Sequence, residues 1–260
     1  MKTAQAHSVI FSPCGGTMRV VRAIMQGIPL RKAEHDITKP AQRKQTLFFG
    51  PDDLVVLGFP VYEGKIAPPV QVLFDMLRGN RTPAVLAAVY GNRAYEGALL
   101  DMERLARLSG FLPFAAIAAV AQHSMIREMG TGRPDQADTE VLTIFGQAAA
   151  ERSAQAAERS VIFKVPGAHF DRRPFPDEMF LPVTDTDACT KCGKCVPVCP
   201  VSAVVAEQPE YITKEKCINC MACVNACPVG AKKLTHPKVP KLKSVLAQTY
   251  AERQEPAFFM

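Results

Sequence analysis

Tryptophan is absent from the sequence and tyrosine occurs only five times, so stacking against a flat ligand would depend on very few side chains. Long apolar runs are also absent. The most apolar stretch, 112–121, is interrupted by Pro113 and is shorter than the roughly 18 residues that a membrane-spanning helix needs. The first seven residues lead into a strand-like run without the apolar region of a secretory signal. We therefore expect a cytoplasmic protein without a membrane span.

Two nucleotide-binding motifs, Gly-x-Gly-x-x-Gly and the Walker sequence, are missing, which leaves no local case for a built-in nicotinamide or ATP site. With 260 residues, 48% hydrophobic and 22% charged, the chain can bury one or two cores and is not intrinsically disordered. The formal charge is +6, but basic residues alternate with acidic ones and form no one-sided stripe or helix-turn-helix. We therefore expect no nucleic-acid partner.

Cysteine is the informative residue, because eight of the nine cysteines lie between 189 and 227. A cytoplasmic compartment keeps thiols reduced, so this clustering indicates metal binding rather than disulfides. The spacing C-x-x-C-x-x-C-x-x-x-C-P occurs twice, at 189–200 and 217–228, with an offset of 28 residues. The likeness continues beyond the cysteines, as C-P-V-S-A and C-P-V-G-A, and indicates a duplicated half-domain.

Three thiolates at this spacing can wrap a tight loop around one face of an iron-sulfur cube and leave the fourth iron to a ligand from elsewhere. A pair of zinc sites is the alternative. Zinc ribbons use paired ligands, however, and closely spaced triplets suit a cube better.

The two runs resemble those of the bacterial two-cluster ferredoxins, and all eight cysteine positions match that motif. The resemblance implies two [4Fe-4S] clusters in which the last cysteine of each run completes the other cluster. The first cluster would be held by Cys189, Cys192, Cys195 and Cys227, and the second by Cys217, Cys220, Cys223 and Cys199.

Residues 1–150 alternate β-branched runs with amphipathic stretches, which favours an α/β fold in which helices cover both faces of a parallel sheet. We expect five strands, at 7–12, 34–38, 53–59, 84–90 and 112–121. Helices are expected near 17–26, 69–78, 96–108 and 134–160. Five strands in this alternation suit a flavodoxin-like order, in which a ligand binds beyond the carboxyl ends of the strands.

Three loops at that edge of the sheet carry candidate ligand-binding residues. After the first strand, Ser-Pro-Cys-Gly-Gly-Thr at 12–17 leads directly into a helix, whose N–H groups could surround a phosphate. The loops that follow the third and fourth strands each contain an aromatic residue that could flank a flat ring.

Together the three loops resemble the FMN site of flavodoxins, over about the first 145 residues. This resemblance implies FMN binding by Ser12, Cys14, Gly15, Gly16, Thr17, Pro60, Val61, Tyr62, Gly64, Tyr90, Gly91, Asn92 and Tyr95. Cys14 and Gly16 stand where the usual phosphate loop has a hydroxyl residue and an asparagine. A flavodoxin-like domain that has lost its cofactor is the alternative.

Three side chains are candidates for further chemistry. A helix N-terminus would lower the pKa of Cys14 and favour a redox role beside the flavin, whereas the simpler interpretation is a small residue that fills the place of serine or threonine. His123 follows the fifth strand at the same edge and could donate a proton to reduced flavin or substrate, or be an ordinary loop histidine. Tyr95 is a second candidate proton source.

We expect a flavodoxin-like domain at 1–160, an extended proline-rich connector at 161–182, a ferredoxin domain at 183–238 and a C-terminal helix with a docking tail at 239–260. The combination resembles the flavodoxin-ferredoxin fusion proteins of anaerobic bacteria and archaea. It implies an electron-transfer flavoprotein whose partner is a redox protein. The alternative is an FMN-dependent terminal reductase of a small organic acceptor, fed through the ferredoxin domain. A homo-oligomer stays open.

The charge of +6 takes on a different meaning once cofactors are counted. Each cluster with its four thiolates contributes about −2, and the FMN phosphate about −2 more. The basic excess is thus compensation for bound negative charge rather than a sign of an anionic macromolecular partner.

Overall fold

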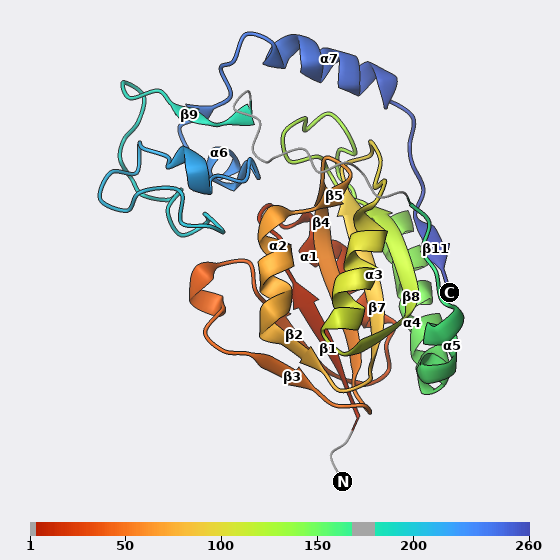
Figure 1. Ribbon diagram of the computed structural model, residues 1–260. Helices are drawn as coiled ribbons and strands as arrows, with labels where there is room; N and C mark the ends of the chain where they lie inside the picture. The colour runs from red at the N-terminus through yellow and green to blue at the C-terminus, as the bar shows by residue number, and fades with distance from the viewer. Residues whose placement is uncertain (1–3, 168–179) are drawn as a thin grey trace.

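A central sheet organises the computed structural model, which describes residues 4–167 and 180–260 (Figure 1). Five of its strands are parallel, in the order β2-β1-β4-β7-β8. Their bounds are Gln5–Ile10 for β1, Arg31–Asp36 for β2, Leu54–Tyr62 for β4, Thr82–Tyr90 for β7 and Phe111–Val120 for β8. This is the flavodoxin-like strand order that the sequence predicts, with its switch point between β1 and β4.

Two further strands extend this sheet. The C-terminal strand β11 (Ala257–Phe259) runs antiparallel to β8, and β5 (Lys65–Ile66) forms a hairpin with the end of β4. Phe258 of β11 packs on Phe145, with ring centroids 5.4 Å apart. The sequence suggests only that this apolar end docks on the body; the structure shows that it docks as an edge strand.

Helices cover both faces because the central strands are apolar on both. Leu54 and Val56 face α1 (Gly16–Gln26) and α4 (Gln136–Arg152), whereas Val55 and Leu57 face α2 (Pro68–Leu73) and α3 (Ala98–Leu108). This alternation follows the two-residue period of a strand. The helices α1 and α4 approach so closely that a Cβ added at Gly146 would lie 1.9 Å from the carbonyl oxygen of Ile24.

Two expected helices are shorter than the sequence pattern suggests. The helix expected at 69–78 ends at Leu73, followed by a 3-10 turn at Phe74–Met76 and by β6 (Leu77–Gly79), which pairs with β3 (Leu47–Phe49). The helix expected at 134–160 is divided by a 3-10 turn at Ser153–Gln155 into α4 and α5 (Ala156–Ile162).

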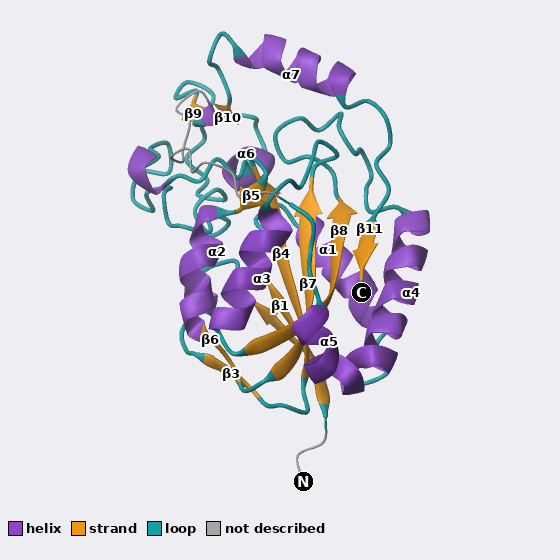
Figure 2. Cartoon of the chain, turned by 45° about the vertical axis from the view of Figure 1, so that its right-hand side comes forward, coloured by secondary structure: helices purple, strands orange, loops and turns teal. Residues whose placement is uncertain are grey.

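The C-terminal part contains short elements around the cysteines. Strands β9 (Val183–Thr184) and β10 (Lys232–Lys233) pair antiparallel, and α6 (Ala222–Asn225) lies within the second cysteine run. Helix α7 (Val239–Thr249) then crosses beyond the carboxyl ends of the parallel strands, as Figure 2 shows. Residues 168–179 of the expected connector lie outside the described residues. No helix in the described ranges is long and apolar enough to cross a membrane.

Candidate cofactor site

A cavity of about 520 Å³ lies at the carboxyl ends of β1, β4 and β7. All three loops that the sequence singles out contribute to its wall. The expected residues that line it are Ser12, Cys14, Gly16, Thr17, Pro60, Val61, Tyr62, Tyr90 and Gly91. A volume in this range is typical of sites for cofactor-sized ligands.

The loop after β1 has the geometry of an anion site. Gly15 adopts a left-handed conformation with φ of 83°, which turns the chain into α1. The Ser12 hydroxyl accepts a hydrogen bond of 3.0 Å from the backbone N–H of Met18. Ser12 thus caps one N–H group of the first turn of α1, and this turn contains no acidic residue, so the positive end of the helix can attract a phosphate.

Packing explains why residue 16 is a glycine, at the position where the usual phosphate loop has an asparagine. A Cβ at this position would lie 2.9 Å from the Cβ of Ala121, just beyond the end of β8. The loop after β8 therefore approaches α1 too closely for a side chain at residue 16.

Two of the three tyrosines reach the cavity. Tyr62 and Tyr90 line it, whereas Tyr95 packs behind Tyr90 with ring centroids 5.6 Å apart. Burial, with the neighbouring Tyr95 phenol, raises the pKa of Tyr90 to about 12, so the ring stays neutral. The structure does not place Tyr95 where it could deliver a proton directly into this cavity.

Three other expected residues are also absent from the described cavity wall: Gly15, Gly64 and Asn92. Gly64 leaves room for the side chain of Glu96, whose carboxylate oxygen would lie 1.8 Å from an added Cβ. The Asn92 amide instead binds the C-terminal tail, donating to the carbonyl oxygens of Tyr250 and Glu252 at 2.9 Å each.

His123 lines the cavity in a defined tautomer. Its Nδ1 accepts hydrogen bonds of 3.1 Å from the backbone N–H groups of Met125 and Ile126, so the proton of the neutral ring is on Nε2. Burial, together with Arg93 and Lys243, lowers the pKa of His123 to about 4. At neutral pH the ring is thus neutral, and its Nε2–H group can donate a hydrogen bond into the cavity.

The structure contradicts the expectation that the helix N-terminus lowers the pKa of Cys14. Desolvation raises the pKa of this thiol to about 11, although the residue as a whole is exposed. The sulfur lies between two C-terminal groups: it donates to the carbonyl oxygen of Cys220 at 3.0 Å and accepts from the Asn225 amide at 3.4 Å. Cys14 is therefore a protonated contact residue.

The residues that cover the cavity, which we call its roof, were not predicted from the sequence. It consists of residues more than 80 positions away from the three loops along the chain, namely Phe180, Ile218, Asn219, Leu242 and Leu246. Ile218 and Asn219 belong to the second cysteine run, and the two leucines belong to α7. Leu242 and Leu246 are four residues apart and so share a helix face, which is the signal that could have marked α7 as a covering helix.

The two cysteine runs repeat each other in backbone conformation. Left-handed residues flank the second of the four cysteines in each run: Lys191 and Gly193 in the first run, Asn219 and Met221 in the second. Left-handed residues at alternate positions turn successive backbone N–H groups toward one side of the chain. The resulting concave arrangement binds anions and occurs at many iron-sulfur sites. The repeat continues at Ser202 and Gly230, which follow the two Cys-Pro pairs and are also left-handed.

The fourth cysteine of each run lies with the other run. Cys199 lines one small cavity together with Cys217, Cys220 and Cys223. Cys227 interacts electrostatically with Cys192 and Cys195. In the described ranges no three His, Cys, Asp or Glu side chains converge on a position for a single metal ion. The cross-pairing of the runs fits the donor set of two cubes.

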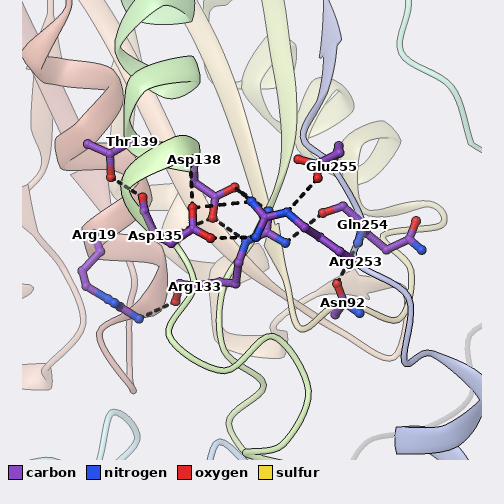
Figure 3. A network of polar contacts seen from close by, with 9 residues as sticks. All are labelled: Arg19, Asn92, Arg133, Asp135, Asp138, Thr139, Arg253, Gln254 and Glu255. Atoms are coloured by element: carbon purple, nitrogen blue, oxygen red, sulfur yellow. Dashed lines mark hydrogen bonds and ion pairs between the residues drawn. The ribbon is translucent and has the colours of Figure 1, made fainter.

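A polar network holds the C-terminal segment in place after α7 (Figure 3). The Arg133 guanidinium pairs with the buried carboxylate of Asp138 and donates to the carbonyl oxygen of Gln254 at 2.9 Å. Arg253 donates to Asp135 at 2.7 Å and pairs with Asp138 at 3.3 Å. These contacts fix Arg253 and Gln254 against the start of α4, three residues before β11 begins.

Comparison with known proteins gives one family match and several structural ones. Residues 181–228 match the 4Fe-4S dicluster domain. Similar solved structures include a flavodoxin from the domain Archaea, with 16% identity, a TM-score of 0.40, and coverage of 58% of this chain and 99% of that one. A flavodoxin from Streptococcus pneumoniae TIGR4 has 14% identity, a TM-score of 0.41 and coverage of 57% and 99%. No curated protein matches the chain.

The strand order of the sheet defines the fold of the first part, and the family match defines the second. The chain therefore joins an N-terminal domain of flavodoxin-like fold to a C-terminal 4Fe-4S dicluster domain, a combination that fits a flavodoxin-ferredoxin fusion.

Proposed function

We propose that this protein is an electron-transfer flavoprotein that passes single electrons between a redox partner protein, two [4Fe-4S] clusters and FMN. The first domain, 1–160, would hold FMN, and residues 183–238 would hold the clusters. When bound, the clusters supply one-electron steps and the flavin accepts one or two electrons, so the chain can collect electrons singly and release them in pairs.

One observation carries this proposal: the loop between Cys217 and Cys220 forms part of the cavity wall. Ile218 and Asn219, the two residues between these ligands, both line the cavity that the flavodoxin-like loops build. A cluster on the second run would therefore be adjacent to a flavin in the cavity. Cys192, by contrast, is exposed, so a cluster on the first run would be open to a partner.

Each part of the cavity has a role in this proposal. Ser12, Gly16 and Thr17, with the N-terminus of α1, would bind the phosphate. Tyr62 and Tyr90 would contact the ring on two sides, and His123 would donate a hydrogen bond from Nε2. Joining both redox groups on one chain replaces a bimolecular encounter with a high effective concentration.

Anaerobic reconstitution tests the proposal. The loaded protein is expected to hold about eight iron atoms and one FMN, and reduced clusters should pass electrons to the flavin. We call the cluster completed by Cys217, Cys220, Cys223 and Cys199 the inner cluster and the other one the outer cluster. Cys220→Ser, which removes a ligand of the inner cluster, should slow flavin reduction by a reduced ferredoxin and leave FMN binding unchanged. Cys192→Ser is the matched variant at the outer cluster and should slow the same step. A wild-type protein that binds neither iron nor flavin would refute the proposal.

A terminal reductase of a small organic acceptor is the second candidate. The observation that favours it is that the cavity extends past the flavodoxin-like loops to Ser124, Met125 and the leucines of α7. We infer room for an acceptor beside the ring, with His123 as hydrogen-bond donor. Turnover of quinones, nitro compounds and enones, fed by reduced ferredoxin, separates the candidates. Rates no higher than those of free FMN would exclude this second function.

A further inference from the structure

A buried lysine lies between the two cysteine runs. Lys232, the first residue of β10, is only 3% exposed, and its ammonium donates to the Thr184 hydroxyl at 2.8 Å. That hydroxyl in turn donates to the backbone carbonyl oxygen of Glu210 at 2.7 Å. Lysine is almost never fully buried unless its charge is balanced, and a hydroxyl carries no charge.

The internal repeat shows which side chain occupies the equivalent position in the other half of the domain. At the offset of 28 residues that relates the two runs, Ala231-Lys232 corresponds to Ala203-Val204. Val204 is 4% exposed and forms a β-bridge with Ile212, so both halves place the residue in a short strand with its side chain buried. One half uses an apolar side chain and the other an ammonium. Burying an ammonium without compensation costs several kcal/mol, so packing alone does not account for Lys232.

The negative charge that can balance Lys232 comes from both cysteine runs. Lys232 interacts electrostatically with Cys195 of the first run and Cys223 of the second. Glu210 is a further acidic neighbour, and its carboxylate already pairs with Lys191 at 2.8 Å. Each cluster with four thiolates carries about −2, so the loaded domain supplies a larger negative charge than Glu210 does.

We propose that Lys232 is a buried cation that raises the reduction potentials of both clusters. The inference rests on the proposed function, because it requires clusters on both runs. Uptake of one electron from a low-potential donor changes the net charge of a cluster and its thiolates from about −2 to about −3. A fixed positive charge nearby stabilises the more negative form, and it does so more strongly in a dry interior than in water.

The adjacent residue provides a matched control. Lys233 follows Lys232 in β10, so its side chain lies on the opposite face of the strand. It is half exposed and pairs with Asp185 at 2.9 Å. Lys233→Met removes the same formal charge as Lys232→Met, but from a position where solvent screens it.

The test measures cluster potentials in the reconstituted holoprotein by redox titration monitored with electron paramagnetic resonance. Lys232→Met should shift the equilibrium constant for cluster reduction about tenfold toward the oxidised form, which is 59 mV for a one-electron couple. Lys233→Met should leave the potentials close to those of the wild type, and Lys232→Arg should retain most of the wild-type value. Unchanged potentials in a fully loaded Lys232→Met protein would overturn the inference.

Loss of the clusters in the neutral variant is also informative. If Lys232→Met does not retain iron, a role of charge requires that Lys232→Arg retains about eight iron atoms with potentials near the wild type. A purely steric role predicts that the bulkier arginine fails as well, and that result would refute the proposal. Failure of the wild type to bind clusters is a separate outcome, which contradicts the proposed function itself.

Discussion

The thiol of Cys14 donates a hydrogen bond to the backbone carbonyl oxygen of Cys220, with 3.0 Å between sulfur and oxygen. The first residue belongs to the loop after β1, at the proposed phosphate site, and the second is a proposed ligand of the inner cluster. The Asn225 amide donates to the same sulfur at 3.4 Å. A single side chain thus joins the flavin half of the site to the cluster half.

We predict that Cys14→Val loosens the cluster loop, because valine fills the space but can neither donate nor accept. Loss of the two weak hydrogen bonds of the sulfur, together worth about 1 kcal/mol, would increase amide exchange at residues 218–222 about fivefold. Cys14→Ser keeps a donor and an acceptor and should change exchange less. Hydrogen exchange of the loaded protein, followed by mass spectrometry, checks this. Protection in Cys14→Val equal to that in Cys14→Ser and in the wild type would show that the thiol contact has no part in docking the loop.

Arg43 makes a second connection between the halves. Its guanidinium donates to the carbonyl oxygen of Pro200, beside the proposed ligand Cys199, at 2.9 Å. It also donates to the carbonyl oxygens of Ile37 and Thr38 and lies 5.6 Å from the centre of the Phe11 ring.

Arg43→Ala should lower the free energy of unfolding by about 1–3 kcal/mol, since three carbonyl groups lose a charged donor. It should also speed iron release to a chelator. Arg22→Ala is the control: it removes an exposed pair with Glu34, at 2.7 Å, which is worth about 0–1 kcal/mol. Urea unfolding and iron release are the measurements. Similar losses in the two variants would contradict a special role for Arg43.

The cysteine runs and the parallel sheet were predictable because their signals are local. A spacing such as that of Cys217, Cys220 and Cys223 specifies a tight loop, and alternating apolar runs specify strands buried on both faces. The turn between β1 and α1 was predictable for the same reason, since glycines between a strand and a helix determine its path.

The remainder of the site depends on contacts between distant segments. Asn92 follows a strand at the ligand-binding edge, yet its amide binds residues 250–254, a pairing that no local pattern records. The roof residues Leu242 and Leu246 belong to a helix whose apolar face could have packed on many surfaces. The pKa of Cys14 followed desolvation rather than the helix terminus, and the sulfur contacts Cys220 and Asn225 of the second cysteine run.

Asn92 should be essential for holding the C-terminal segment. Its Oδ1 accepts from the Gln254 N–H at 3.1 Å, in addition to its two donated bonds, and its φ of 67° is left-handed. Asn92→Gly tolerates this φ, so it removes the three hydrogen bonds without adding strain. Trypsin should then cleave α7 at Lys241 and Lys243 several-fold faster. Arg253→Gln, which weakens the neighbouring anchor to Asp135, should act in the same direction, and unchanged cleavage in both variants would argue against the anchoring role.

His123 should make stability depend on pH. Because burial lowers the pKa of His123 to about 4, the unfolded chain, in which a histidine titrates near 6.5, binds a proton more readily than the folded protein. The contribution is present above pH 6.5 and is lost as the pH falls toward 4. Between pH 7.5 and 5.5 the wild type should lose about 1.4 kcal/mol more than His123→Asn, whose Oδ1 can still accept from Met125 and Ile126. Urea unfolding at the two pH values measures this, and equal slopes for the two proteins would mean that His123 is protonated as easily in the folded state as in the unfolded one.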